Sequence, residues 1–195
     1  MYISDSSDRV IYERNLSTAF DVSSASGSSS LYLGVSLQPY SLSFNNDGTK
    51  LYVLSTSTVY EYDLTTGFDV TTASLSTSNS LSGQETGMQG LTFNNDGTKM
   101  FTVGSNNDKV YEYALSSAFD VSSSSLTYTD SLDISSEEFT PTEIKFNHDG
   151  TKMYISGSNG DDINEYTLSS AFDITSTVTH KLSLIHISEP TRPSI

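Results

Sequence analysis

Carboxylates are the side chains of this sequence with the clearest chemical potential, and they recur at fixed places. One glutamate stands in each of three Val/Ile-x-Glu-Tyr segments, and one aspartate in each of three Asp-Gly pairs: Glu61, Glu112 and Glu165, and Asp47, Asp96 and Asp149. Carboxylates can bind metals or transfer protons, but an active site is built once per domain, whereas these groups occur once per repeat. Aspartates in turns commonly accept hydrogen bonds from their own backbone. We therefore expect structural roles, and predict neither catalytic nor metal-binding residues.

The other candidates for catalysis or metal binding lack partners. The 195 residues include no cysteine and three histidines, and none of His148, His180 and His186 has the sequence context of a zinc site or a Ser–His–Asp triad. The oxygen-rich segment Asn106-Asn107-Asp108 could bind Ca²⁺, although the spacing of an EF-hand loop is absent. We expect no cofactor, with Ca²⁺ left open as an alternative.

The charge of the chain excludes two classes of partner. The net charge is −15, whereas nucleic acids and anionic membrane surfaces attract basic proteins. No apolar run approaches the roughly 20 residues that span a bilayer. We therefore predict no nucleic-acid partner and no membrane insertion.

The elements that position the carboxylates are repeated hairpins. A Phe-Asn-Asn/His-Asp-Gly-Thr-Lys segment occurs three times: Phe44–Lys50, Phe93–Lys99 and Phe146–Lys152. Asp-Gly between apolar runs predicts a tight hairpin turn, because glycine accepts a positive φ. A period of about 50 residues is typical of a repeat protein.

Each repeat contains four short segments that alternate between apolar and polar residues. In the middle repeat the predicted strands are residues 91–93, 99–103, 110–115 and 125–129. No stretch shows helical periodicity, so we expect almost no helix. A four-stranded unit with apolar residues on both faces must stack against neighbouring units. The sequence therefore predicts an all-β fold, a β-propeller of four-stranded antiparallel blades, in preference to a β-solenoid with its shorter rungs.

Both ends of the sequence interrupt the repeat. Met1–Ser4 is identical to Met153–Ser156, so the first repeat begins at its second strand. We predict a partial blade over residues 1–36 that lacks its first strand, and blades over 37–85, 86–136 and 137–181. About four blades would form an incomplete, open arc. Residues 182–195 depart from the repeat, and 182–192 resemble translated sequencing-adapter DNA, so we expect a non-native segment there, with a native tail as the alternative.

The repeat pattern resembles that of a known group of proteins. A Phe-x-x-Asp-Gly-Thr-Lys segment followed by an apolar strand and Val-Tyr-Glu-Tyr is similar to the WD-like and YVTN-type propeller repeats of bacterial, archaeal and phage surface proteins. The resemblance covers residues 1–181 and implies a propeller in an extracellular, cell-surface or virion-associated protein. The Trp-Asp and Gly-His signatures of true WD repeats are absent.

The loops that vary between repeats predict where a ligand would bind. Loops after the first and third strands repeat closely, whereas those after the second and fourth strands vary and should share the opposite face. Variable loops on a rigid scaffold commonly carry binding sites. The predicted binding residues on this face are Gln84, Glu85, Gln89, Asn107, Asp108, Glu137, Glu138, Asp161 and Asp162. Solvated surface is the alternative interpretation of the same residues.

The absence of a catalytic constellation indicates a non-enzymatic protein. We expect a fragment of a surface or virion-associated protein with a binding, adhesion or structural role and a protein or glycan as ligand. The alternative is a fragment of a lactonase- or quinoprotein-like propeller enzyme whose catalytic residues lie in blades outside this sequence. The small number of arginines and histidines argues against that alternative.

Overall fold

The computed structural model describes residues 1–34, 36–158 and 162–183, which form four antiparallel sheets. The first sheet contains three strands, β1 (Tyr2–Asp5), β2 (Val10–Leu16) and β3 (Ala25–Tyr32). The second contains β4 (Ser41–Phe44), β5 (Lys50–Ser55), β6 (Thr58–Leu64) and β7 (Ala73–Ser80). The third contains β8 (Met88–Phe93), β9 (Lys99–Gly104), β10 (Lys109–Leu115) and β11 (Leu126–Asp133). The fourth contains β12 (Pro141–Phe146), β13 (Lys152–Gly157), β14 (Ile163–Leu168) and β15 (Val178–Ser183).

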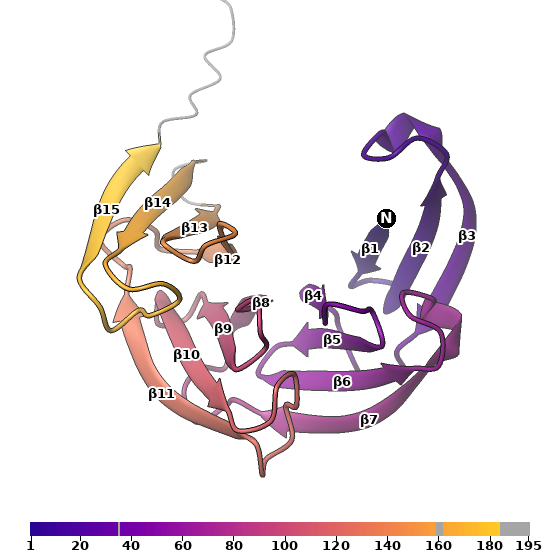
Figure 1. Cartoon of the computed structure of the whole chain (residues 1–195), viewed down its shortest axis with the longest axis horizontal. Coiled ribbons are helices and arrows are strands. Elements are labelled where there is room, and N and C mark those ends of the chain that lie inside the picture. Colours follow the sequence, from indigo (N-terminus) through magenta and orange to yellow (C-terminus); the bar gives the residue numbers. More distant parts are fainter. Residues whose placement is uncertain (35, 159–161, 184–195) are drawn as a thin grey trace, which may run out of the picture.

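The sheets follow one another around an arc (Figure 1), and within each sheet the strands pair in chain order. The strands β4, β8 and β12 lie on the concave side, and β3, β7, β11 and β15 lie on the outside. Figure 1 also shows an open space between the first and fourth sheets. The predicted all-β propeller with an open arc is therefore confirmed.

Apolar side chains fill the spaces between consecutive sheets, because the strands carry apolar residues on both faces. The described residues form three core clusters, and each joins residues of two neighbouring sheets. Between the second and third sheets, for example, Tyr52 and Leu54 pack with Leu91 and Met100, and all four are fully buried. Each such side chain contributes on the order of 1.5–3 kcal/mol to folding, so face-to-face stacking is the main source of stability.

The turn before the outermost strand of each sheet has an unusual conformation. It contains a Phe-Asp-Val or Phe-Asp-Ile sequence, and in the first two sheets it ends in a single helical turn, η1 (Val22–Ser24) and η2 (Val70–Thr72). The phenylalanine has a positive φ in all four copies, between 52° and 66°. A left-handed conformation is strained for phenylalanine. Three of the four rings pack against the Asp-Gly hairpin of their own sheet, whereas Phe20 of the first sheet adopts the same conformation at 99 % exposure.

That packing comes from the glycine of the Asp-Gly hairpin. Phe119 donates its N–H to Gly97 O at 2.8 Å, and its ring lies so close to Gly97 that a Cβ there would be 2.2 Å from a ring carbon. Gly97 itself has a φ of +71°. The glycine is thus required both for the hairpin turn and for contact with the ring, and Gly48 and Gly150 repeat the arrangement with Phe68 and Phe172.

Candidate functional site

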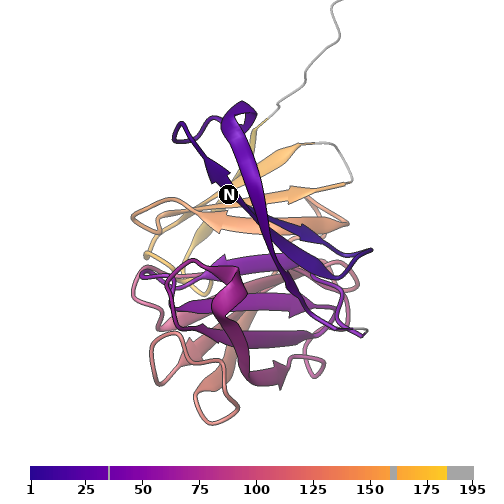
Figure 2. The same ribbon diagram turned by 90° about the vertical axis from the view of Figure 1, so that its right-hand side faces the viewer.

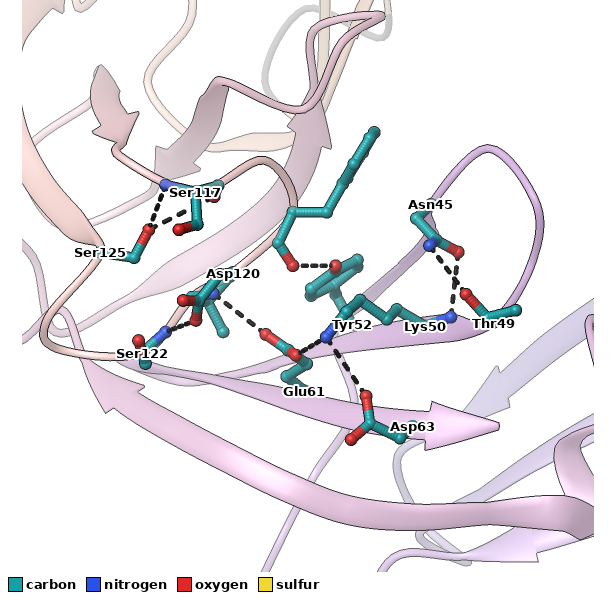
Figure 3. Close-up of polar contacts among 12 residues, drawn as sticks. Asn45, Thr49, Lys50, Tyr52, Glu61, Asp63, Ser117, Asp120, Ser122 and Ser125 are labelled. Carbon is teal, nitrogen blue, oxygen red and sulfur yellow. Dashed lines mark hydrogen bonds and ion pairs between the residues drawn. The ribbon is translucent and has the colours of Figure 1, made fainter. Parts of the chain in front are cut away.

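The glutamates in the third strands join one sheet to the next. Glu61 on β6 is 2 % exposed, and its Oε2 accepts the backbone N–H of Val121 in the third sheet at 3.0 Å. Its Oε1 pairs with Lys50 Nζ, which also contacts Asp63 Oδ1 at 3.2 Å (Figure 3). A buried carboxylate requires such partners to offset its desolvation.

Equivalent glutamates make the same contact at the two other junctions. Glu13 Oε2 accepts the Val70 N–H at 3.1 Å, and Glu112 Oε2 accepts the Ile174 N–H at 3.2 Å. Lys99 pairs with Glu112 at 2.7 Å. The carboxylates therefore hold the Phe-Asp-Val/Ile turn of the following sheet.

The aspartates of the Asp-Gly hairpins bond within their own turns. Asp96 Oδ1 accepts the Thr98 N–H at 3.0 Å and the Thr98 hydroxyl at 2.6 Å. These hydrogen bonds lower the pKa of Asp96, because they stabilise the ionised carboxylate. Asp47 and Asp149 have the same partners in their own hairpins, and the pKa of each is lowered for the same reason.

The variable loops gather on one face of the arc. Figure 2 shows the strands running across the thickness of the arc, with the connecting loops on two opposite sides. The β5–β6 and β7–β8 loops bond to each other, since Leu81 N–H donates to Ser57 O at 2.6 Å. The β9–β10 and β11–β12 loops are joined likewise, by Ile134 N–H to Asp108 O at 3.0 Å.

Two of the predicted binding carboxylates are buried and engaged with their own loops. Glu85 is 2 % exposed and accepts the N–H groups of Thr86 and Gly87 at 2.8 Å each and that of Asn107 at 2.9 Å. Glu138 is fully buried and accepts the Thr140 N–H at 2.9 Å. Both side chains fix loop conformation, and neither presents its carboxylate on the surface.

Small residues opposite these glutamates make room for them. A Cβ at Gly104 would lie 2.2 Å from Glu85 Cγ, and one at Gly157 would lie 2.0 Å from Glu138 Cδ. The second sheet has Ser55 at the equivalent position, and there the Ser55 hydroxyl accepts the Gln38 N–H at 3.1 Å. The sequence shows that glutamate in one loop occurs together with glycine at the end of a strand, as in Glu85 with Gly104 and Glu138 with Gly157. Only the fold shows that the two residues of each pair are in contact.

The structure brings four of the predicted binding residues together. Asn107 Nδ2 donates to Gln84 O at 3.3 Å, beside the contact between Asn107 N–H and Glu85. Asp108 follows with a φ of 52°. Burial, and then the neighbouring charges of Asp133, Glu85 and Glu138, raise the pKa of Asp108.

The other predicted residues lie apart from this group. Gln89 Nε2 donates to Ser105 Oγ at 3.4 Å, and Asp162 Oδ1 accepts from Asn164 Nδ2 at 3.1 Å. Glu137 is half-buried in the β11–β12 loop. Asp161 lies outside the described residues, as do His186 and residues 184–195 of the predicted non-native segment.

Exposed aromatic side chains on the variable-loop face were missed by the sequence analysis. Phe139 in the β11–β12 loop is 58 % exposed, and Tyr40 in the loop before β4 is 38 % exposed. The Tyr40 hydroxyl donates to Gln38 Oε1 at 3.3 Å. Exposed rings on otherwise polar loops provide flat contact surface for a ligand.

A charged pair on the innermost strand of the fourth sheet was also missed. Lys145 Nζ lies 3.1 Å from Glu143 Oε1 and 3.5 Å from Leu91 O on β8. The third sheet has Gly90 and Thr92 at the matching repeat positions. A departure from the repeat on an inner strand was the available signal, because repeated residues account for the scaffold and unique ones do not.

The described residues offer neither a cluster of metal ligands nor a membrane-spanning helix. No group of three or more His, Asp or Glu side chains within them could hold a metal ion. None of the helical segments described is long and apolar enough to cross a membrane. Calcium binding remains an untested alternative.

Comparison with known proteins identifies related folds. No protein-family profile and no curated protein sequence matches the chain. Among solved structures, a putative 6-phosphogluconolactonase from Bacteroides fragilis matches 92 % of this chain and 49 % of its own, with 14 % identity and a TM-score of 0.61. A periplasmic gluconolactonase from Pseudomonas aeruginosa matches 93 % of this chain and 52 % of its own, with 14 % identity and a TM-score of 0.57. A protein from Lactobacillus plantarum matches 92 % of this chain and 52 % of its own, with 14 % identity and a TM-score of 0.61. This chain therefore spans about half the length of these neighbours.

These neighbours correct one expectation from the sequence. The prediction of a non-enzymatic protein is wrong, because several similar structures bear lactonase names, including a further putative 6-phosphogluconolactonase from Bacteroides uniformis with 12 % identity. The lactonase alternative is supported better. The specific WD-like or YVTN-type assignment stays a prediction.

Proposed function

We propose that this chain is part of a propeller enzyme that hydrolyses a sugar lactone. The supporting observation is the match of more than nine-tenths of the chain to propellers named as 6-phosphogluconolactonase and gluconolactonase. The chain covers about half of each neighbour, so the proposal places the reacting groups on the inner strands that this half contains.

Glu143 and Lys145 are the residues we assign to the chemistry. Water adds to the lactone carbonyl carbon, the ring C–O bond breaks, and a hydroxy acid forms. A carboxylate can take the proton from the attacking water and return it to the departing ring oxygen. An ammonium group can stabilise the negative charge that develops on the carbonyl oxygen. These two groups lie 3.1 Å apart on β12, with Glu143 38 % and Lys145 54 % exposed at the side chain.

Lactone hydrolysis by the purified chain tests this proposal. Glucono-δ-lactone and 6-phosphogluconolactone would be followed by base uptake at constant pH, against the spontaneous rate. We expect a rate above background that Glu143→Gln lowers by about 10²- to 10⁴-fold, as for loss of a general base, while Asp8→Asn, at an exposed position in the β1–β2 turn, leaves it unchanged. The proposal fails if the chain neither accelerates hydrolysis nor binds the product gluconate.

The variable-loop face supports a second, compatible proposal. Its exposed Phe139 and Tyr40 suit stacking against a sugar ring or contact with a protein, which is the binding role that the sequence predicts. We propose a location outside the cytoplasm, at a cell surface or virion, and the periplasmic neighbour supports the first part of this. A glycan array with Phe139→Ala as the matched variant tests the face, and Leu75→Ala, an exposed residue on β7, is the control.

A further inference from the structure

Each junction between sheets is made of two complementary halves. One half is a strand face on the second and third strands of a sheet, and the other is the Phe-Asp-Val/Ile turn of the next sheet. At the first junction the Tyr2 hydroxyl donates to Phe68 O at 2.6 Å, and Glu13 accepts the Val70 N–H at 3.1 Å. Val70 is fully buried in a cluster with Ile11.

The second and third junctions repeat this design. The Tyr52 hydroxyl donates to Phe119 O while Glu61 accepts from Val121. At the third junction Lys99 Nζ donates to Phe172 O at 2.8 Å, while the glutamate of the same sheet accepts from the isoleucine of the turn. The geometry is therefore a property of the repeat, since it occurs wherever two sheets meet.

The fourth sheet presents a strand face that no turn covers in the described part of the chain. Tyr154, Ile163 and Glu165 stand at the positions of Tyr2, Ile11 and Glu13. Ile163 is 37 % exposed, whereas Ile11 is fully buried. Glu165 is paired with Lys152 at 2.9 Å, as Glu61 is paired with Lys50.

The first sheet presents a turn that no strand face covers among the described residues. Phe20 is 99 % exposed. Val22 is 69 % exposed, whereas Val70 and Val121, its equivalents in the turns of the second and third sheets, are fully buried. No hydrogen bond from the Val22 N–H is found within the described part of the chain. The two uncovered halves lie at opposite ends of the arc (Figure 1).

We propose that a second copy of this chain docks on these ends, with Glu165 and Tyr154 of one copy binding the Phe20–Val22 turn of the other. The contact would continue the interface already present three times within the chain. A head-to-tail interface closes into a ring when its rotation allows. Two copies with two such junctions give eight sheets, within the range of known propellers, and match the neighbours' length, of which this chain covers about half. This inference does not depend on lactone hydrolysis.

Sedimentation velocity over a wide range of concentrations tests the proposal at near-physiological salt, where the repulsion between acidic chains is screened. We expect a monomer–dimer equilibrium for the wild type. Because a closed dimer has two junctions, Glu165→Ala and Val22→Pro should each remove one hydrogen bond to a charged group from both, and should weaken the dimer by at least about a hundredfold. Glu137→Ala, a change outside both halves, should leave it unaltered.

The Val22→Pro substitution is designed to remove only the backbone N–H donor of residue 22. Val22 begins η1, and proline is well tolerated at the first position of a helical turn. Asp21 before it has φ −98° and ψ 101°, an extended conformation that proline favours in its predecessor. Circular dichroism and thermal melts of the dilute variant should match those of the wild type.

Mixing the two variants gives the decisive result. The Glu165→Ala copy keeps an intact turn, and the Val22→Pro copy keeps an intact strand face, so the mixture should form one-to-one heterodimers with near wild-type affinity for a single junction. Self-association of either variant at wild-type strength would overturn the proposal. So would a wild type that stays monomeric throughout, or a mixture that fails to associate although both variants are folded.

Discussion

Replacement of Glu61 by alanine removes the centre of the junction between the second and third sheets. The Val121 N–H loses its acceptor, which lies 3.0 Å away in the wild type, and Val121 is fully buried. Lys50 loses one of two carboxylates but keeps Asp63 at 3.2 Å. The main effect of the substitution is therefore a buried donor without a partner.

The size of the effect follows from these contacts. A buried N–H left without an acceptor costs about 1–3 kcal/mol, and loss of an ion pair with Lys50, whose side chain is 29 % exposed, adds up to about 1 kcal/mol. We expect Glu61→Ala to lower the free energy of unfolding by about 1–4 kcal/mol. For a chain of this size the melting temperature would fall by roughly 2–16 °C.

Thermal and urea unfolding followed by circular dichroism measure this loss, and a matched variant identifies its cause. Glu61→Gln keeps a carbonyl oxygen for the Val121 N–H, so it should lose less than half as much stability as Glu61→Ala. Glu137→Ala, in a loop outside the junctions, should change little. The reasoning is refuted if Glu61→Ala melts like the wild type, or if Glu61→Gln is as unstable as Glu61→Ala.

Three further changes test other parts of the structure. Gly97→Ala should cost about 2–4 kcal/mol, from the positive φ and the aromatic ring packed on the glycine, whereas Gly83→Ala, with no atom within 4 Å of its added Cβ, should cost far less in the same unfolding assay. Glu85→Ala should cost about 2–4 kcal/mol by leaving loop amides without an acceptor, and the double variant Glu85→Ser with Gly104→Ser, which copies the second sheet, should recover part of it. Because the pKa of Asp96 is lowered on folding, its contribution is complete above the usual value of 3.8 and is lost as the pH falls through the lower folded value. In melts across acid pH, Asp96→Asn should therefore lose stability less steeply than the wild type, and equal slopes would contradict this.

Local signals in the sequence were sufficient to predict the strands and hairpins. The Asp-Gly pairs mark turns, and alternation marks strands such as β9, so the sheets could be placed without coordinates. The contact between Phe119 and Gly97 could not be predicted, because Gly97 lies 22 residues earlier and meets the ring only after folding.

The partners of the carboxylates were equally inaccessible from sequence. Glu61 accepts a backbone N–H that lies 60 residues away in another sheet. The recurrence of glutamate once per repeat therefore indicated a structural role, but it did not identify the group that the glutamate binds. Glu85 was predicted to bind a ligand because it lies in a variable loop, whereas Gly104 opens the space that buries it. Glu143 and Lys145 were overlooked because binding residues were expected in the variable loops, whereas these two residues break the repeat on an inner strand.

Glu13, Glu61 and Glu112 each hold the turn of the next sheet, whereas the first turn has no such partner among the described residues. Amide hydrogen exchange by NMR on a sample dilute enough to be monomeric compares the four equivalent N–H groups directly. We predict slow exchange at Val70, Val121 and Ile174 and fast exchange at Val22. Equal exchange rates at all four amides, or a Val121 amide that exchanges no more slowly in the wild type than in Glu61→Ala, would contradict the account.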